Sequence, residues 1–131
     1  MSSGFGQSTS GAILNHILGK TSYTMPSSVY VALYTVAPTA TTAGTEVSGN
    51  NYSRVTVAPT AFTVTNASAA SNADITFPTP SGSWSTVVAA SLMSATTGGT
   101  LIAFGSLTVS KTIAQDDIIK FASGNLTISL A

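Results

Sequence analysis

The side chains that could do chemistry are few in this chain. Its 131 residues include four Lys or Arg, four Asp or Glu, one histidine and no cysteine. The lack of cysteine excludes disulfides, thiolate metal sites and cysteine nucleophiles together. The single histidine, His16, could join a multi-histidine metal site only through symmetry-related copies of the chain. We therefore expect His16 to be a helix residue satisfied by a local contact.

Two short patterns resemble catalytic or phosphate-binding motifs, but each lacks the context that its chemistry needs. His16, Asp74 and a serine could be drawn as a catalytic triad, yet the chain has no Gly-x-Ser-x-Gly nucleophile turn. The segment 19–21 (GKT) matches the end of a phosphate-binding loop. However, leucine replaces the leading glycine of that loop, and the segment follows a predicted helix instead of a strand. Neither pattern predicts an enzyme.

Acidic side chains also fail to form a convincing site. Asp116 and Asp117 are adjacent, and successive residues entering a strand point to opposite faces, so this pair suits a turn better than acid–base catalysis. A calcium site would need more oxygen ligands in one compact loop than this chain supplies. The sequence thus predicts no catalytic, cofactor-binding or metal site.

Contact with other molecules is the alternative use of exposed side chains. We expect such contacts from the segment before Gly11 and from a long loop over residues 38–51, because loops of that length are usually functional. Trp84 could be a platform for a sugar ring, although a lone tryptophan at the head of an apolar strand favours a core position. The candidate contact residues are Phe5, Gln7, Glu46, Asn50 and Trp84.

Charge is unusually scarce in this sequence. Charged residues make up 6% of the chain and its formal net charge is zero, against about 25% charged residues in an average globular domain. The mean hydropathy is +0.38. Copies of such a chain repel one another weakly, so its surface is either solvated by hydroxyl groups or covered by partners. The absence of a basic cluster argues against a nucleic-acid partner.

Targeting signals and domain organisation are simple. The N-terminal residues lack the basic and apolar regions of a secretory signal, so we do not expect export by that route. No apolar run approaches the roughly 20 residues of a membrane-spanning helix, so we expect no membrane partner.

The length of the chain, 131 residues, suits one domain. We predict a flexible arm over residues 1–10 and a single domain over residues 11–131.

A long hairpin over residues 81–109 is the predicted centre of the fold. Two segments rich in β-branched and aromatic residues flank a turn that contains Gly98 and Gly99. Strict alternation would put Trp84, Val88, Ala90 and Leu92 on one side of the first strand and Val87, Ala89 and Met93 on the other. Because both sides are apolar, we expect this strand to be covered on both faces.

The rest of the chain predicts short strands around this hairpin. Residues 12–18 form an amphipathic helix, with Ser10 as a possible cap and Gly19 at its end. Residues 67–73 form a low-complexity loop. The fold class is therefore all-β: an antiparallel sandwich of about eight strands, jelly-roll or immunoglobulin-like, with one short N-terminal helix. The other strands are predicted at residues 29–35, 52–57, 62–64, 74–77, 117–121 and 126–130.

Several short segments combine into one pattern of turns and core positions. They are residues 12–24 (AILNHILGKTSYT), 29–35 (VYVALYT), 38–39 (PT), 46–49 (EVSG), 52–54 (YSR), 75–78 (ITFP), 82–84 (GSW), 98–101 (GGTL), 105–107 (GSL) and 121–126 (FASGNL). This pattern, which covers nearly the whole chain, resembles a family of small virion proteins of tailed bacteriophages, usually labelled tail fibre. It departs at residues 115–117 (QDD), where a glycine is expected before the aspartate.

The resemblance implies a virion structural protein and no catalytic residue. Long fibres are built from stacked repeats or coiled coils, and this chain has neither. We therefore expect a non-catalytic structural subunit, made in the host bacterial cytoplasm, that binds other virion proteins symmetrically as a capsid decoration or cement protein and forms a homo-oligomer. The alternative is a tail-fibre or tail-surface subunit that binds a host receptor such as a glycan. A glycan-depolymerising enzyme that uses Asp116 and Asp117 is a third and weaker hypothesis.

Overall fold

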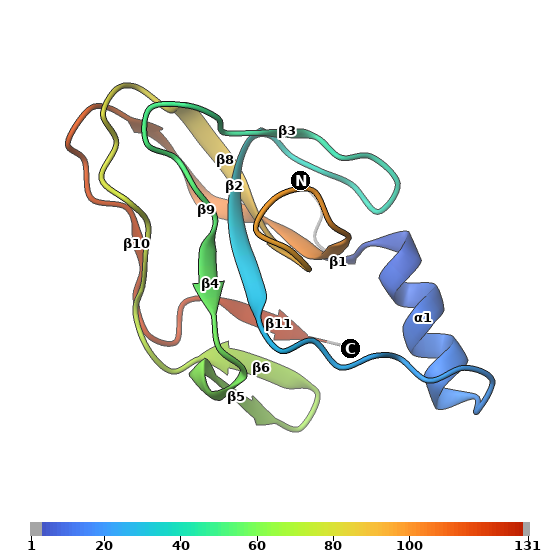
Figure 1. Ribbon diagram of the computed structural model, residues 1–131. Coiled ribbons are helices and arrows are strands. Elements are labelled where there is room, and N and C mark those ends of the chain that lie inside the picture. The colour runs from blue at the N-terminus through green and yellow to red at the C-terminus, as the bar shows by residue number, and fades with distance from the viewer. Residues whose placement is uncertain (1–3, 130–131) are drawn as a thin grey trace.

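The computed structural model describes residues 4–129, which fold into two β layers with one projecting helix (Figure 1). The elements in chain order are β1 (Gly4–Phe5), α1 (Gln7–Ile17), β2 (Val29–Val36), β3 (Thr45–Glu46), β4 (Val55–Val57), a short 3-10 helix (Pro59–Ala61), β5 (Phe62–Thr65), β6 (Ser68–Ser71), β7 (Ile75–Thr76), β8 (Ser85–Met93), β9 (Leu101–Ile113), β10 (Lys120–Phe121) and β11 (Thr127–Ser129).

One large sheet and two small ones make up the layers. The large sheet has the order β1-β9-β8-β2-β3, and β4 also pairs with β2. The small sheets have the orders β10-β7 and β11-β6-β5. Every strand pair is antiparallel. The predicted class, an all-β antiparallel sandwich with one short N-terminal helix, is confirmed. The described residues contain eleven strands where about eight were expected, because several strands have only two or three residues.

The predicted central hairpin is present as β8 and β9. Gly98 and Gly99 have positive φ values of 60° and 77° in its turn, which is the backbone region that glycine reaches without strain. The predicted sides of β8 are partly wrong, because Val87 lies in the larger core and Val88 packs on the opposite side. The cause is a register shift between Val87 and Ala89, where the strand loses its simple alternation.

The main core lies between the large sheet and the two small ones. Tyr52 contacts both Trp84 and Phe77 there, with ring centroids 5.3 Å and 6.4 Å apart. A smaller cluster of buried residues, Ala32, Tyr34, Ala89 and Met93, lies on the other face of β2 and β8. The main cluster is Val31, Leu33, Val47, Val57, Ile75, Phe77, Trp84, Val87, Ala90, Leu92, Ala103 and Ile113. Both faces of the central strands are therefore covered within one chain.

The N-terminal helix begins earlier than predicted. Gly4 and Phe5 pair with β9, and α1 begins at Gln7 instead of residue 12, with Gly6 rather than Ser10 at its N-cap position. Residues 1–3 of the predicted arm lie outside the described residues, and the boundary between arm and domain stays a prediction. The segment 67–73 was also wrongly predicted as a loop, because Ser68–Ser71 forms β6 between β5 and β11.

Candidate binding site

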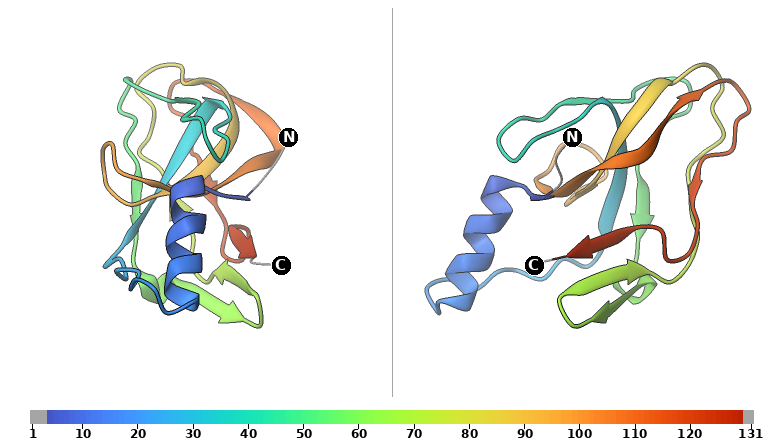
Figure 2. Two further views of the ribbon diagram at one scale, coloured as in Figure 1. Left: turned by 90° about the vertical axis from the view of Figure 1, so that its right-hand side faces the viewer. Right: turned by 180° about the vertical axis from the view of Figure 1, so that it is seen from behind.

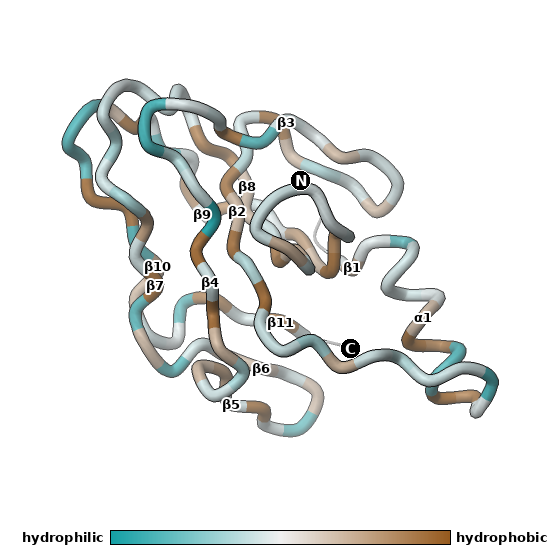
Figure 3. The backbone as a smooth tube through the Cα atoms, viewed as in Figure 1, coloured by the Kyte–Doolittle hydropathy of each residue, from teal (hydrophilic) through white to brown (hydrophobic). Residues whose placement is uncertain are grey.

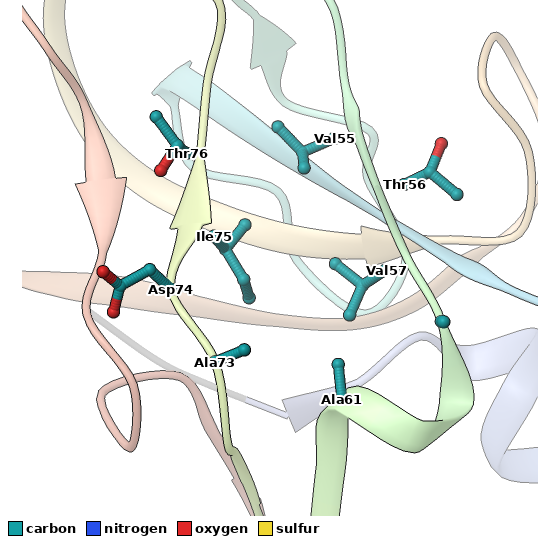
Figure 4. Close-up of a pocket in the computed structure, with 9 residues that line it drawn as sticks. Val55, Thr56, Val57, Ala61, Ala73, Asp74, Ile75 and Thr76 are labelled. Carbon is teal, nitrogen blue, oxygen red and sulfur yellow. The ribbon is translucent and has the colours of Figure 1, made fainter.

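A shallow pocket between β4 and β7 has little capacity for chemistry (Figure 4). It has a volume of about 310 Å³, and its walls are mainly aliphatic side chains and threonines. Asp74 is its one ionisable lining residue. The Asp74 carboxylate accepts a hydrogen bond from the Ser123 N–H at 2.9 Å and lies 3.5 Å from Lys120 Nζ. Both contacts lower its pKa. The carboxylate is thus engaged with β10 and the turn after it.

A second pocket, of about 420 Å³, lies over the smaller core and is the better candidate. The loop over residues 39–44 forms one wall, and the turn between β8 and β9 forms another. Glu46 and Arg54 lie between these walls. The lining residues are Tyr34, Thr39, Ala40, Thr41, Thr42, Ala43, Gly44, Glu46, Arg54, Met93, Gly98, Gly99 and Leu101. We call this the Glu46–Arg54 pocket.

Glu46 and Arg54 form a two-point ion pair. Arg54 Nη2 lies 2.8 Å from Glu46 Oε1, and Arg54 Nε lies 2.9 Å from Glu46 Oε2. The remaining terminal nitrogen, Nη1, donates to the carbonyl oxygens of Ala95 and Gly98, both at 2.8 Å. The Arg54 side chain is 8% exposed and that of Glu46 is 25% exposed. The pair therefore ties β3 to the turn between β8 and β9.

Tyr52 completes this cluster beneath the pocket. Its Oη donates to Glu46 Oε2 at 2.7 Å and accepts a hydrogen bond from the Leu33 N–H at 3.0 Å. Burial and the bond to Glu46 raise the pKa of Tyr52 far above its ordinary value. Burial alone would raise the pKa of Glu46, but the hydrogen bonds from Arg54 and Tyr52 lower it. Near neutral pH, Glu46 is thus ionised and Tyr52 keeps its proton.

The loop over residues 39–44 is fixed by its own hydroxyl groups. Thr39 Oγ1 accepts hydrogen bonds from the N–H groups of Thr41 and Thr42 at 3.3 Å and 3.0 Å. The Ala40 carbonyl accepts a bond from the Gln7 N–H at 2.9 Å, which joins the loop to the start of α1. Gly44 has a φ of +65°, and a β-carbon there would overlap the Val36 carbonyl oxygen. The pocket therefore has a defined wall that carries hydroxyl groups.

The five predicted contact residues lie in different places. Glu46 lies in the pocket, and Gln7 is anchored beside it through its backbone. Phe5 packs against the main core from β1. Trp84 is 2% exposed, so the hypothesis that it is a sugar platform is wrong and its core interpretation is right. Trp84 Nε1 donates to the Asn50 carbonyl at 2.9 Å, and Asn50 Nδ2 donates to the Ser83 carbonyl at 2.9 Å.

The residues weighed for catalysis are not brought together. His16 lies on exposed α1, where its Nδ1 accepts a hydrogen bond from the Tyr23 N–H at 3.1 Å. Asp117 Oδ2 accepts one from the Ala114 N–H at 2.8 Å, and Asp116 has a φ of +68°, so both residues build a turn. Within residues 4–129, no group of three or more His, Cys, Asp or Glu side chains is arranged to hold a metal ion.

Sequence reasoning found Glu46 but missed its partners in this cluster. Arg54, Tyr52 and Tyr34 were assigned to strands without a role. One usable signal was present: Arg54 is among only four basic residues, and it lies eight positions after Glu46. Because charged residues are so few, a cation this close in sequence to a lone carboxylate was the one available candidate for its partner. The bonds from Arg54 to the carbonyls of Ala95 and Gly98 join segments far apart in the sequence. They could not be predicted from the residues around Arg54.

Comparison with known proteins identifies one matching family. The family described as Podophage GP4 fiber I protein gp80 matches residues 4–129. No curated protein matches the chain. Among the helices of residues 4–129, none has the length and apolar character needed to cross a bilayer. The match thus extends over all the described strands and the helix.

Proposed function

Because this chain belongs to the family of Podophage GP4 fiber I protein gp80, we propose that it is a non-catalytic fibre subunit carried on the tail of the virion. A structural role in the phage virion, in association with other virion components, follows from the family itself. The family description supports a fibre subunit better than a capsid decoration protein. Capsid decoration was the preferred prediction from the sequence. What supports a non-catalytic role is a pocket whose charged groups neutralise each other.

The position on the particle can be tested by imaging. We expect gold-labelled antibodies against the chain to bind intact particles at the tail, and density that fits residues 4–129 to appear there in a cryo-electron microscopy map. Particles from a phage that lacks the gene are the control for labelling. Antibody label distributed over the capsid faces would contradict a position on the tail and would support the capsid decoration hypothesis instead.

Host-glycan binding is a second candidate function, and the Glu46–Arg54 pocket favours it. The pocket combines threonine hydroxyls, one carboxylate edge and the apolar side chains of Met93 and Leu101. Saccharides present the same mixture of hydroxyl groups and apolar C–H faces, and a few convergent polar groups in a concave site fix the orientation of a ligand. Its volume of about 420 Å³ suits one or two sugar rings.

A blocking variant tests this second function. Thr41 lines the pocket and is exposed, and its hydroxyl forms no hydrogen bond with any of residues 4–129, so Thr41→Arg should fill the pocket without unfolding the chain. We expect saturable binding on a glycan array and about tenfold or greater weakening in Thr41→Arg. Thr56→Arg, at the exposed rim of the β4–β7 pocket, is the matched control. Equal binding by both variants would contradict a glycan site in this pocket.

A further inference from the structure

The charges of the Glu46–Arg54 pocket neutralise each other before any ligand enters. Within residues 4–129, Glu46 and Arg54 are the only charged residues that line it. Their two-point contact, with N–O distances of 2.8 Å and 2.9 Å, pairs one carboxylate with one guanidinium. The pocket therefore offers a ligand neither a free cation nor a free anion.

The guanidinium of Arg54 is almost fully occupied by its own chain. Four of its five N–H groups are used, two on Glu46 and two on the carbonyl oxygens of Ala95 and Gly98. The Arg54 side chain is only 8% exposed. A ligand carboxylate could bind Arg54 only by displacing Glu46, and the Glu46 carboxylate would then lie partly buried without its cation. That exchange is unfavourable, because a buried charge without a partner is strongly destabilising.

The carboxylate of Glu46, in contrast, keeps one position for a ligand. A carboxylate accepts about four hydrogen bonds. Described residues supply three: one from Arg54 to Oε1, and one each from Arg54 and Tyr52 to Oε2. Oε1 can therefore accept one more donor, and the Glu46 side chain is 25% exposed. A neutral hydroxyl group can use this position, whereas an ammonium group there would be repelled by the neighbouring guanidinium.

The walls around this carboxylate carry no charge. Figure 2 shows that the loop over residues 39–44 and the β8–β9 turn extend from the same side of the large sheet. Figure 3 shows this loop in mostly pale colours, the middle of the hydropathy scale, because it consists of threonine, alanine and glycine. The Thr41 hydroxyl bonds to no described residue, so it is available to a ligand hydroxyl. Met93 and Leu101 add an apolar surface beside it.

We propose that the Glu46–Arg54 pocket selects neutral saccharides and rejects acidic and amino-bearing ones. The proposal rests on the second candidate function, glycan binding, and adds the chemical class of the glycan. One ring hydroxyl donates to Glu46 Oε1, another bonds to the Thr41 hydroxyl, and a C–H face of the ring packs on Leu101. The ion pair provides the rejection: a uronic or sialic acid would bring its carboxylate to Glu46, and an amino sugar would bring its ammonium to Arg54.

A glycan array that carries neutral, acidic and free-amine sugars at equal density tests this selectivity on the natural chain. We expect the bound glycans to be neutral, and each to bind about tenfold or more tightly than its own form oxidised to the uronate. Binding should not change between low and high salt, because a neutral ligand has no charge to screen. Binding that weakens steeply with salt would contradict a neutral ligand.

A neutral blocking variant shows which signals come from this pocket. Thr41→Trp fills the pocket without adding charge, whereas an arginine at position 41 could itself bind an acidic sugar. Thr56→Trp, at the exposed rim of the β4–β7 pocket, is the matched control. Neutral glycans should lose binding in Thr41→Trp and keep it in Thr56→Trp. An acidic or amino-bearing glycan that binds the natural chain and is lost only in Thr41→Trp would overturn the proposal.

Replacement of the carboxylate by an amide tests the role of the ion pair. Glu46→Gln keeps the shape of the side chain but leaves the Arg54 charge uncompensated, so the preference for neutral over acidic sugars should fall about tenfold or more. Asp74→Asn makes the same chemical change at the exposed carboxylate beside Lys120 and should keep the preference. Circular dichroism checks that both variants are folded. An unchanged preference in folded Glu46→Gln would contradict selection by the ion pair.

The outcomes separate this proposal from the function on which it rests. If the natural chain binds no glycan on the array, both glycan binding and the selectivity are overturned. If it binds acidic glycans through the pocket, glycan binding stands and the selectivity alone is overturned. If Glu46→Gln does not fold, the array and its salt dependence on the natural chain still decide. None of these results bears on the site of antibody labelling.

Discussion

Replacement of Arg54 by methionine is expected to lower the free energy of unfolding by about 3 kcal/mol, because it leaves the Glu46 carboxylate without its cation. Arg54 is 8% exposed, so little water can replace it beside Glu46. The same change removes the donor that reaches the carbonyls of Ala95 and Gly98. The expected loss is at the lower end for a broken buried pair because Glu46 is 25% exposed.

Two further variants separate the charge effect from general disturbance. Arg54→Met/Glu46→Leu should lose less stability than Arg54→Met alone, because an apolar pair leaves no buried charge behind. Lys120→Met breaks the exposed pair with Asp74 and should leave the stability almost unchanged. Urea unfolding, followed by Trp84 fluorescence at one fixed protein concentration, measures all three. Equal losses for Arg54→Met and Lys120→Met would show that the buried pair contributes no more than a surface one.

The central hairpin could be predicted from the sequence because its signals are local. β-branched residues on both strands and two adjacent glycines in the turn specify β8 and β9 without reference to the rest of the chain. The irregularity between Val87 and Ala89 could not be predicted, because no glycine or proline marks it. It arises where the pairing shifts from Lys111 to Ser106 on β9. The shift moves Val87 into the main core and Val88 to the opposite side.

Other elements depend on contacts between distant segments. The Ser-Ala-Ala-Ser sequence of β6 has weak strand propensity, but pairing with β5 on one side and β11 on the other makes it a strand. The helix begins early because Gly6 and Gln7 donate their N–H groups to Ile102 and Ala40. In the Glu46–Arg54 pocket, likewise, the sequence indicates the carboxylate, while the fold supplies the groups around it. Local propensity is overruled wherever a neighbour in space provides the hydrogen bonds.

Replacement of Trp84 by alanine should cost the most stability of any change considered, about 4 kcal/mol. The side chain is 2% exposed, and its ring meets Tyr52 edge to face at 87°. Its removal leaves a cavity in the main core and frees Tyr52, which holds Glu46 by a hydrogen bond. Trp84→Phe is the informative companion, because it keeps most of the ring and removes only the bond from Nε1 to the Asn50 carbonyl. That carbonyl also accepts the Ser81 N–H at 3.0 Å, so the expected cost is about 1 to 2 kcal/mol.

The measurement needs a probe other than tryptophan fluorescence, because Trp84 is the only tryptophan. Circular dichroism of the β signal during urea unfolding serves all three chains, and Trp84→Phe remains measurable if the alanine variant does not fold. The expected order of stability is the natural chain, then phenylalanine, then alanine. This order separates the core role from the sugar-platform hypothesis, since an exposed platform could be removed at a cost below about 0.5 kcal/mol. An alanine variant as stable as the natural chain would contradict the core role of Trp84 and show that the packing around Tyr52 is dispensable.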